Sequence, residues 1–249
     1  MKTLGIIPAR FGSTRFPGKP LALIHGKTMI ERVYRRASQS TLLSDVVVAT
    51  DDSRIFDHVS SFGGKVAMTS PSHPSGTDRC AEVLQSQNEP FDLVINIQGD
   101  EPYIHPGQID LLINCLLRSD ADIATLVKKI VDPAELDNLN IPKVVRQNSG
   151  YALYFSRRTI PFCKEQDRLN FLEKGLFFKH IGIYGYRSQI LPALAKLPAG
   201  NLESCESLEQ LRWLENGYRI MTAVSDHDNI AVDTPDDIKV IEQKFGLTD

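Results

Sequence analysis

Continuous apolar runs alternate with amphipathic segments through the first half of the chain, and this alternation limits the fold more than any other feature. Four of these runs predict buried strands, at 3–8, 45–52, 65–70 and 92–102. Apolar spacing and helix-boundary residues predict helices after them, at 28–40, 54–62, 77–87 and 109–119. Strands that are apolar on both faces are typical of parallel sheets covered by helices. The sequence therefore predicts an α/β fold with a mostly parallel central sheet flanked by helices.

The second half of the chain carries a different pattern. Residues 143–157 and 177–187 alternate in β fashion and contain many aromatics, which predicts longer, partly antiparallel strands. A helix is expected over 201–213. The chain then closes with a short strand at 232–233, a turn, and a helix that Pro235 and the acids after it open. We therefore expect three parts, 1–128, 129–225 and 226–249, of which the last returns to the first.

Composition and charge exclude several classes of protein. The net charge of −3 and the isoelectric point near 6.1 leave no global basic field for a nucleic-acid backbone, so we expect no nucleic-acid partner. No segment approaches the ~20 apolar residues of a membrane span, and no secretory signal is visible. We therefore expect a cytoplasmic protein without a membrane partner. The four cysteines are widely spaced and are expected to be free thiols.

The stretch IIPARFGSTRFPGKPL, at 6–21, places three cations directly after the first strand: Arg10, Arg15 and Lys19. Ligands of open α/β sheets bind beyond the carboxyl ends of the strands, and glycines let the backbone approach an anion closely. We interpret this loop as a phosphate-binding site, and a solvated basic turn is the alternative. The loop is not a Walker A motif, because five residues separate Gly12 from Gly18 and Pro20 replaces the metal-binding hydroxyl. Pro20 also argues against a helix that opens at Lys19.

Further motifs follow that loop in order along the chain. The full set is PARFGSTRFPGKPL at 8–21, SGTDR at 75–79, NIQGDEP at 96–102, GYALYFSR at 150–157, HIGIYGYR at 180–187, ESLEQLR at 206–212 and VDTPDD at 232–237. Together these motifs resemble those of the 3-deoxy-manno-octulosonate (Kdo) cytidylyltransferases, a family of sugar-activating nucleotidyltransferases. Phe16, Asp78 and Phe162 depart conservatively from the expected pattern, in which Leu, Glu and Trp are frequent.

The resemblance implies both a fold and a reaction. The fold is that of nucleotide-diphospho-sugar transferases: a Rossmann-like nucleotide-binding part and a smaller mixed-sheet subdomain, at 129–225, for sugar binding and dimerisation. The reaction is CTP + Kdo → CMP-Kdo + diphosphate, by attack of the sugar's anomeric hydroxyl on the α-phosphate with Mg²⁺ as cofactor. The resemblance also implies a cytoplasmic homodimer that serves lipopolysaccharide biosynthesis.

Charge neutralisation and in-line positioning dominate such a transfer. The residues expected to supply them are Arg10, Arg15, Lys19, Asp100 and Asp233. By resemblance, Arg15 lies near the leaving diphosphate. Asp100 and Asp233 each end a predicted strand, and two carboxylates at neighbouring strand ends can hold Mg²⁺; capping of the following turn or helix is the alternative for each.

The nucleotide is expected to contact residues on both sides of the first strand's end. These are Pro8, Ala9, Arg10, Lys19, Ser75, Gly76, Thr77 and Asp100. Ser75 or Thr77 is also a candidate cap for the helix that follows. Asp51 and Asp52 have two open interpretations: by resemblance they lie near the base, and by residue type they cap the next helix.

By resemblance, the sugar pocket comprises Arg79, Gln98, Arg157, His180, Tyr184, Glu209 and Gln210. Arg157 is the expected partner of the Kdo carboxylate, because a guanidinium group can bind a carboxylate through two parallel hydrogen bonds. His180 and Tyr184 are four residues apart and so share one face of a strand. Without the resemblance, His180 and Tyr184 would be interpreted as structural, and Glu209 and Gln210 as a solvated helix face.

Other functions stay open at this point. One is another sugar-activating reaction: with 8-amino-Kdo or sialic acid, with a different nucleotide, or with a neutral sugar. A second is a nucleotide-binding regulatory domain without catalysis, which predicts loss of Lys19, Asp100 or Asp233, although all three are present. A dinucleotide-binding oxidoreductase is excluded, because no G-x-G-x-x-G follows the first strand.

Overall fold

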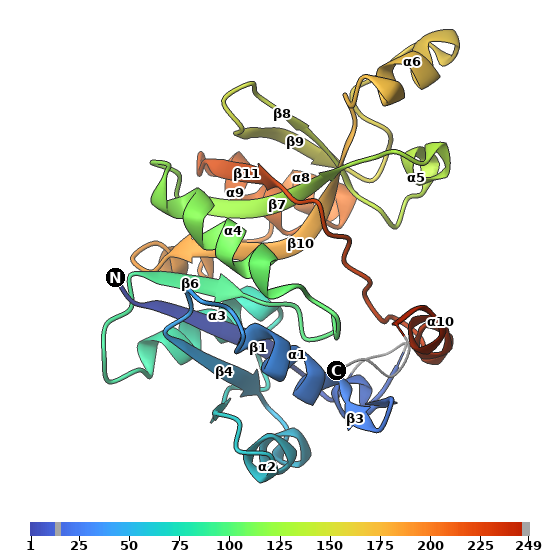
Figure 1. Cartoon of the computed structure of the whole chain (residues 1–249). Coiled ribbons are helices and arrows are strands. Elements are labelled where there is room, and N and C mark those ends of the chain that lie inside the picture. The colour runs from blue at the N-terminus through green and yellow to red at the C-terminus, as the bar shows by residue number, and fades with distance from the viewer. Residues whose placement is uncertain (13–15, 246–249) are drawn as a thin grey trace. The chain divides into compact units, whose positions relative to one another are not determined.

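The computed structural model describes residues 1–12 and 16–245. Contacts between residues divide the chain into two compact units. The first unit combines Met1–Asp110 with the chain from Asn229 onward, and the second unit is Leu111–Asp228. The blue start of the chain and its dark red last helix in Figure 1 thus belong to the same unit. The three functional parts predicted from the sequence, with borders near residues 128 and 225, stay a prediction.

The first unit holds a parallel sheet with the strand order β6-β1-β4-β5. β1 (Thr3–Ala9) lies between β6 (Leu93–Asn96) and β4 (Asp45–Thr50), and β5 (Val66–Met68) follows β4. Every residue of β1 except Pro8 is buried, as expected for a strand covered on both faces. The predicted mostly parallel sheet is confirmed. The four expected strands all form, although β6 ends before the acidic residues that follow it.

The helices after these strands begin at polar caps. α1 (Met29–Ala37) is capped by Thr28, α2 (Ser53–Ser61) by Asp52, and α3 (Gly76–Gln85) by Ser75. In each cap a side-chain oxygen accepts a first-turn N–H that the helix itself leaves without a partner. The capping interpretations of Asp52 and Ser75 are therefore confirmed. α4 (Pro106–Leu117) then leads into the second unit.

The segment between β1 and α1 contains a short helical turn that the sequence analysis does not expect. This turn, η1 (Lys19–Leu21), is a 3-10 helix, and the antiparallel pair β2 (Leu23–Ile24) and β3 (Lys27–Thr28) follows it. The prediction that no helix opens at Lys19 is wrong for this turn. Pro20 is tolerated because the first N–H groups of a helix have no partner within it.

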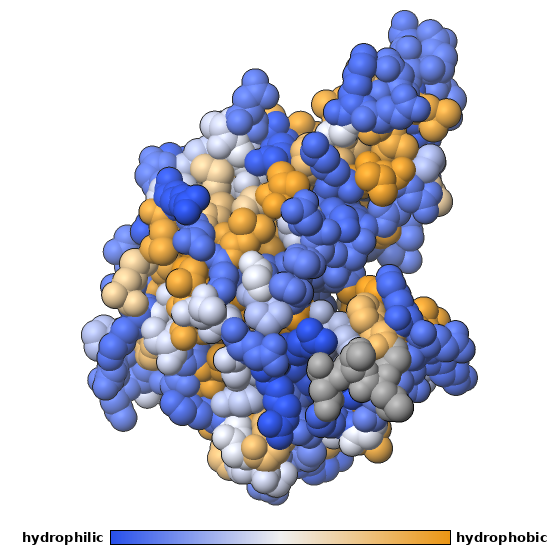
Figure 2. Space-filling model, in the orientation of Figure 1, coloured by the Kyte–Doolittle hydropathy of each residue, from blue (hydrophilic) through white to orange (hydrophobic). Residues whose placement is uncertain are grey.

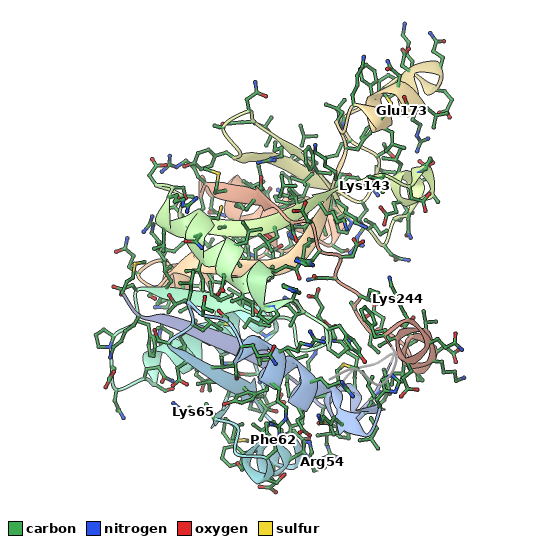
Figure 3. The ribbon with its side chains drawn as sticks, viewed as in Figure 1. Arg54, Phe62, Lys65, Lys143, Glu173 and Lys244 are labelled. Carbon is green, nitrogen blue, oxygen red and sulfur yellow. The ribbon has the colours of Figure 1, made fainter. Side chains whose placement is uncertain are left out.

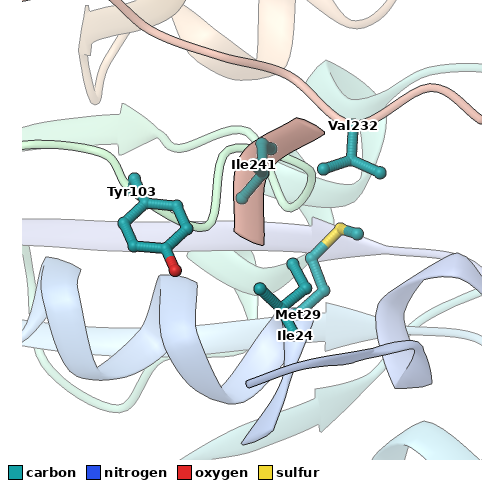
Figure 4. Packing of buried hydrophobic residues seen from close by; sticks show 5 residues of the cluster. All are labelled: Ile24, Met29, Tyr103, Val232 and Ile241. Atoms are coloured by element: carbon teal, nitrogen blue, oxygen red, sulfur yellow. The ribbon is translucent and has the colours of Figure 1, made fainter. Parts of the chain in front are cut away.

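The last helix, α10 (Pro235–Phe245), packs on the first unit through a buried cluster. The cluster consists of Ile24, Met29, Tyr103, Val232 and Ile241. Figure 4 shows Ile241 of α10 between Tyr103 and Val232. Burial of a side chain such as Ile241 stabilises a fold by roughly 1.5–3 kcal/mol relative to exposure, so these contacts hold α10 in place.

The short strand predicted at 232–233 does not form. Val232 makes one strand-like hydrogen bond, from its N–H to the carbonyl of Asp100 at 2.9 Å. Its carbonyl, however, accepts from Nζ of Lys19 at 2.8 Å. The Val232 N–H thus makes an isolated strand-like contact that does not continue into a ladder.

The second unit contains a mixed sheet around β7 (Ile123–Lys129). β11 (Ile220–Val224) pairs with β7 in parallel, and β10 (Phe178–Arg187) pairs with it antiparallel. β8 (Lys143–Arg146) is antiparallel to both β10 and β9 (Ala152–Ser156), which confirms the expected antiparallel strands. Short helices connect these strands: α5 (Pro133–Asp137), η2 (Glu165–Asp167), α6 (Arg168–Glu173), α7 (Leu191–Leu194), α8 (Asn201–Glu206) and α9 (Gln210–Glu215).

Parts of the second unit differ from the expected elements. The sequence analysis assigns no strand to β7 or β11, although the buried run 123–127 in β7 carries the signal of a covered strand. The run IMTAV in β11 is as apolar as IATLV in β7, although only two of its five residues are buried. The expected helix over 201–213 is two helices, because Ser207 adopts a left-handed conformation (φ 53°) that an α-helix does not continue through.

One lysine of the second unit is buried with its ammonium group. Lys143, labelled in Figure 3, is fully buried, and its Nζ donates to the carbonyls of Asn138 (2.8 Å) and Ile141 (2.6 Å). Burial lowers the pKa of Lys143, and the two carbonyls fix the turn before β8.

All four cysteines are free thiols, as expected. Within residues 1–12 and 16–245, every helix is too short or too polar to cross a membrane.

The substitution Ile241→Ala tests the packing of α10. We expect it to lower the free energy of unfolding by about 2–5 kcal/mol, because it leaves a cavity in the cluster around Met29. The neighbouring Val240 is 58% exposed, so Val240→Ala should change that free energy by less than about 0.5 kcal/mol. Denaturation in urea measures both. Equal effects of the two substitutions would contradict the packing described here.

Candidate active site

A cavity of about 300 Å³ opens at the carboxyl ends of β1 and β6 in the first unit. The loops after these strands, the start of α3 and Asp233 line it. The lining residues are Pro8, Ala9, Arg10, Lys19, Pro20, His73, Pro74, Ser75, Gly76, Arg79, Gln98, Gly99, Asp100 and Asp233. The cavity thus lies where the topology of an open α/β sheet favours ligand binding.

Lys19 is the centre of the charged side of this cavity. Its Nζ lies 2.7 Å from Oδ2 of Asp100 and 3.7 Å from Oδ1 of Asp233. The Lys19 side chain is only 16% exposed, while that of Asp233 is 48% exposed. The structure therefore brings together three residues, far apart in the sequence, that the analysis assigns to catalysis.

Asp100 and Asp233 offer a donor set that suits a hard cation. Their oxygens converge on one point, the Lys19 ammonium. No cluster of three or more His, Cys, Asp or Glu side chains suited to a metal ion occurs in residues 1–12 and 16–245. Mg²⁺ commonly uses one or two carboxylates and completes its shell with water and substrate phosphates. Two carboxylates in a cavity that Arg10 and Lys19 also line fit that pattern.

Arg10 and Arg15 are the other two cations of the opening loop. Arg10 lines the cavity directly after β1. Among the described residues, it has no hydrogen-bond or ion-pair partner, so its guanidinium is available to an anion. Arg15, the third predicted cation, lies outside the described residues.

Two glycines allow the cavity to form between neighbouring elements. A Cβ on Gly99 would lie 2.7 Å from the carbonyl oxygen of Pro8, closer than real Cβ contacts. A Cβ on Gly76 would lie 3.3 Å from the Pro8 ring. Ser75 and Gly76 line the cavity at the positive end of α3, whereas Thr77 is buried and does not line it.

Arg79 and Gln98, two predicted sugar-binding residues, also line the cavity. The guanidinium of Arg79 is buried and donates to Asp51 at 2.6 Å and to Thr69 at 2.7 Å. This places Asp51 as the ion-pair partner of Arg79, while Asp52 caps α2. The two adjacent carboxylates thus have different roles.

His73 is a cavity residue that sequence reasoning missed. Its Nε2 lies 2.5 Å from Oε2 of Glu82, and the same oxygen accepts the N–H of Ser70 at 2.9 Å. These two contacts, with that of Ser70 the stronger, lower the pKa of Glu82. The position of His73 could have identified it, because residues 70–79 follow the end of a strand of the parallel sheet. Pro20, Pro74 and Gly99 are cavity residues that no residue-type argument identified.

Glu101 is a second residue that the analysis missed. It follows Asp100, is 6% exposed, and accepts a hydrogen bond from Nδ2 of Asn229. Burial, reinforced by the charge of Asp100, raises the pKa of Glu101 to about 8. A buried carboxyl group therefore follows a predicted metal ligand directly in the sequence.

The other five predicted sugar-binding residues belong to the second unit. Arg157 uses all three guanidinium nitrogens to donate to the carbonyls of Leu139, Glu206 and Ser207, at 2.8–3.1 Å. Glu209 precedes α9, and Gln210 is its first residue. Nε2 of Gln210 is buried and has no hydrogen-bond partner among the described residues. Gln210 thus has an unused donor, whereas Arg157 already holds three backbone segments.

His180 and Tyr184 lie together on β10, with ring centroids 5.3 Å apart. They face Val127 and Thr125 on β7, two residues apart, because a bulge adds two residues to β10 between them. His180 and Tyr184 still share one face of β10, because the bulge adds an even number of residues. Burial lowers the pKa of His180 to about 3 and raises that of Tyr184 well above 10, so both are neutral near pH 7.

Comparisons with known proteins agree with this arrangement. A family model described as Cytidylyltransferase matches residues 4–220. The chain is 52% identical over 236 residues to the 3-deoxy-manno-octulosonate cytidylyltransferase of Cytophaga hutchinsonii, covering 94% of each protein. It is 51% identical over 246 residues to that of Bacteroides thetaiotaomicron, covering 98% of each.

Solved structures give the same result. The structure of a CMP:2-keto-3-deoxy-manno-octonic acid synthetase complexed with CTP is 41% identical to this chain, with a TM-score of 0.89 and 98% of each chain covered. A 4-diphosphocytidyl-2C-methyl-D-erythritolsynthase from Anaerococcus prevotii shares the fold at 13% identity, with a TM-score of 0.62 and 96% of each chain covered.

The family model places the chain among the cytidylyltransferases, which are nucleotidyltransferases. Within that class, the chain belongs to the 3-deoxy-manno-octulosonate cytidylyltransferase family. The family and the fold predicted from the motifs are both confirmed.

The depressed pKa of His180 predicts an acid-sensitive stability. Below the unfolded value of 6.5, the unfolded chain binds a proton that the folded chain takes up only near pH 3. The free energy of unfolding should therefore fall by up to about 1.4 kcal/mol per pH unit below 6.5 through this group.

The variant His180→Gln should lack that contribution, so urea denaturation between pH 4.5 and 7 should give it a shallower pH slope than the wild type. His227 is exposed, and His227→Gln serves as the matched control with an unchanged slope. Identical slopes for the wild type and His180→Gln would contradict the prediction.

Proposed function

We propose that this chain activates Kdo by the reaction CTP + Kdo → CMP-Kdo + diphosphate. One observation carries the proposal: Arg10, Lys19, Asp100 and Asp233 meet in one cavity at strand ends, in a chain of this family. The relatives are named for cytidylyl transfer to 3-deoxy-manno-octulosonate, and one solved relative is a complex with CTP. Transfer to 8-amino-Kdo or to sialic acid is the alternative.

The nucleotide is proposed to bind along the cavity from α3 to Lys19. Pro8, Ala9, Ser75 and Gly76 would contact the base and ribose, while the buried Thr77, also predicted to contact the nucleotide, follows them in α3. Arg10 and Lys19 would neutralise the triphosphate, with Arg15 near the leaving diphosphate. The place of Arg10 on the cavity wall and the positive end of α3 support this orientation, since both attract anions.

Asp100 and Asp233 are proposed to hold Mg²⁺ together with phosphate oxygens. Their chemistry fits, because Mg²⁺ prefers carboxylates that share it with substrate phosphates. The chemistry that the ion supplies when bound is neutralisation of charge on the phosphate oxygens. Lys19 contacts both carboxylates, so it would keep them oriented toward the phosphates.

In the proposed reaction the sugar's anomeric oxygen forms a bond to the α-phosphorus and loses its proton. The bond from that phosphorus to the β-phosphate oxygen breaks, and diphosphate leaves with the electron pair. Such a displacement needs alignment and charge stabilisation more than a covalent intermediate. Arg10 and Lys19 would stabilise the charge that grows on the leaving group.

The acidic sugar is proposed to contact Arg79, Gln98, Arg157, His180, Tyr184, Glu209 and Gln210. The unused donor on Gln210 and the uncharged rings of His180 and Tyr184 suit a ligand with many hydroxyl groups. Arg157 donates to three carbonyls, and each of its two terminal nitrogens carries a second N–H. A carboxylate could accept from these without displacing the present partners.

We further propose a homodimer formed through the second unit, in a protein that acts in the cytoplasm in lipopolysaccharide biosynthesis. Large apolar side chains are exposed there: Val131, Leu139, Leu153, Phe162, Leu169 and Leu176. Figure 2 shows hydrophobic surface (orange) on the part of this unit that carries α6. Exposed apolar residues in such number support a protein–protein interface.

Diphosphate release from CTP, Kdo and Mg²⁺ tests the function. We expect Asp100→Asn and Asp233→Asn each to lower the rate on the order of a hundredfold, as when a preorganised charge is lost. Asp236→Asn is the matched control: Asp236 is three residues from Asp233 but 86% exposed, so the rate should stay unchanged.

Parallel reactions with UTP, sialic acid or 8-amino-Kdo identify the substrates. Release only with CTP and Kdo would support the proposal. Release with another acidic sugar would keep the nucleotide site and contradict the choice of Kdo. Release with none of the pairs would contradict catalysis of this reaction.

The substitution Phe162→Glu tests the dimer, because Phe162 is 88% exposed and a charge there would oppose apolar contact. We expect light scattering to give twice the monomer mass for the wild type and the monomer mass for the variant. Val240→Glu, at an exposed apolar position of α10 in the first unit, should keep the wild-type mass. A monomeric wild type would contradict the proposal.

A further inference from the structure

The segment from Asn229 to Asp233 brings a predicted metal ligand into the cavity although it forms neither a helix nor a strand. Near its end, the Val232 N–H donates to the Asp100 carbonyl at 2.9 Å. The N–H of Asp233 donates to the Asp237 carboxylate at 2.9 Å. With so few backbone hydrogen bonds, the path of the segment depends on individual side-chain contacts.

Glu101 makes the contact at the start of this segment. Its carboxyl group is buried and accepts from Nδ2 of Asn229. Oδ1 of Asn229 is also buried and has no partner in the part of the chain that is described. Asn229 is therefore held through the single hydrogen bond to Glu101.

The backbone around Glu101 connects the same contact to the turn after β6. The Ile104 N–H donates to the Glu101 carbonyl at 3.0 Å, and the residue before Glu101 is Asp100. Glu101 itself does not line the cavity. Its neighbour in the chain, Asp100, does line the cavity.

The residue before Asn229 has different partners. Asp228 pairs with Lys128 at 2.8 Å and with Lys179 at 3.0 Å, all three in the second unit. Asn229 is the first residue of the chain's return to the first unit. The hydrogen bond to Glu101 is therefore the first side-chain attachment of the returning chain to the first unit.

We propose that Glu101 is a positioning residue that, through Asn229, sets the path of 229–233 and so keeps the Asp233 carboxylate opposite Asp100. The idea rests on the proposed function, because it assigns Asp233 a role in binding CTP with Mg²⁺. Glu101 acts on the nucleotide without touching it. The loss of one partner of a buried hydrogen bond leaves the other partner without that constraint.

The binding of CTP in the presence of Mg²⁺ and without Kdo, measured by calorimetry, tests this role. We expect Glu101→Ala and Asn229→Ala each to weaken CTP binding about tenfold. Glu101→Gln keeps an oxygen that accepts from Asn229, so it should bind CTP within twofold of the wild type. Asp110 is a partly buried carboxylate of the first unit that accepts from Ser40 and Thr41, outside the cavity, and Asp110→Ala is the control for general destabilisation.

A double-variant comparison separates positioning from a purely structural role. If Glu101 acts through Asp233, then Glu101→Ala should weaken CTP binding less than twofold when Asp233→Asn is already present. A tenfold loss in that background, or a tenfold loss in Asp110→Ala, would overturn the proposal. Equal affinity of Glu101→Ala and the wild type would overturn it as well.

Hydrogen exchange of the Val232 amide in the protein without CTP gives an independent readout. We expect exchange at least tenfold faster in Glu101→Ala and wild-type exchange in Glu101→Gln. Unchanged exchange in Glu101→Ala would contradict the proposal. A wild type that does not bind CTP would instead refute the proposed function. Because the exchange experiment needs no nucleotide, it would still test the role of Glu101 in that case.

Discussion

One ammonium group holds the first unit's cavity together. Nζ of Lys19 contacts the Asp100 carboxylate at 2.7 Å and the Val232 carbonyl at 2.8 Å, and so joins segments 81 and 213 residues away in the sequence. A largely buried charge is tolerated only when such partners compensate for its lost hydration. Without it, two carboxylates would converge with no cation between them. The loop after β1, the turn after β6 and the approach to α10 therefore depend on each other.

The packing of α10 makes that interaction available. Ile241 and Val232 share a buried cluster with Met29, so α10 and the segment before it are fixed against α1. Tyr103, in the loop after Glu101, stacks on Phe245 with ring centroids 4.1 Å apart. The apolar cluster thus fixes Val232, whose carbonyl is a partner of Lys19.

The two units offer different chemistry. The cavity of the first unit is lined by cations, which suit phosphates, and by two carboxylates, which suit a metal ion. The second unit surrounds its predicted ligand residues with aromatic rings: Tyr184 packs edge-on against Trp213, with centroids 5.0 Å apart, and His180 is kept uncharged by burial. Neutral donors and acceptors beside apolar rings suit hydroxyl groups, in agreement with the proposed division between nucleotide and sugar.

Local sequence determined much of this molecule. The covered strands β1 and β4, the caps Asp52 and Ser75, and the cations of the opening loop each carry a signal in the residues themselves, because hydrophobic burial and capping act over a few positions. The motifs also identified the family. Tertiary structure alone decided which of these groups meet. Only there does Lys19 contact Asp100 and Asp233, Asp51 pair with Arg79, and Glu101 bind Asn229, because partners up to 214 residues apart leave no local pattern. The same reason explains Val232, whose carbonyl accepts a hydrogen bond from Lys19 far away in the sequence.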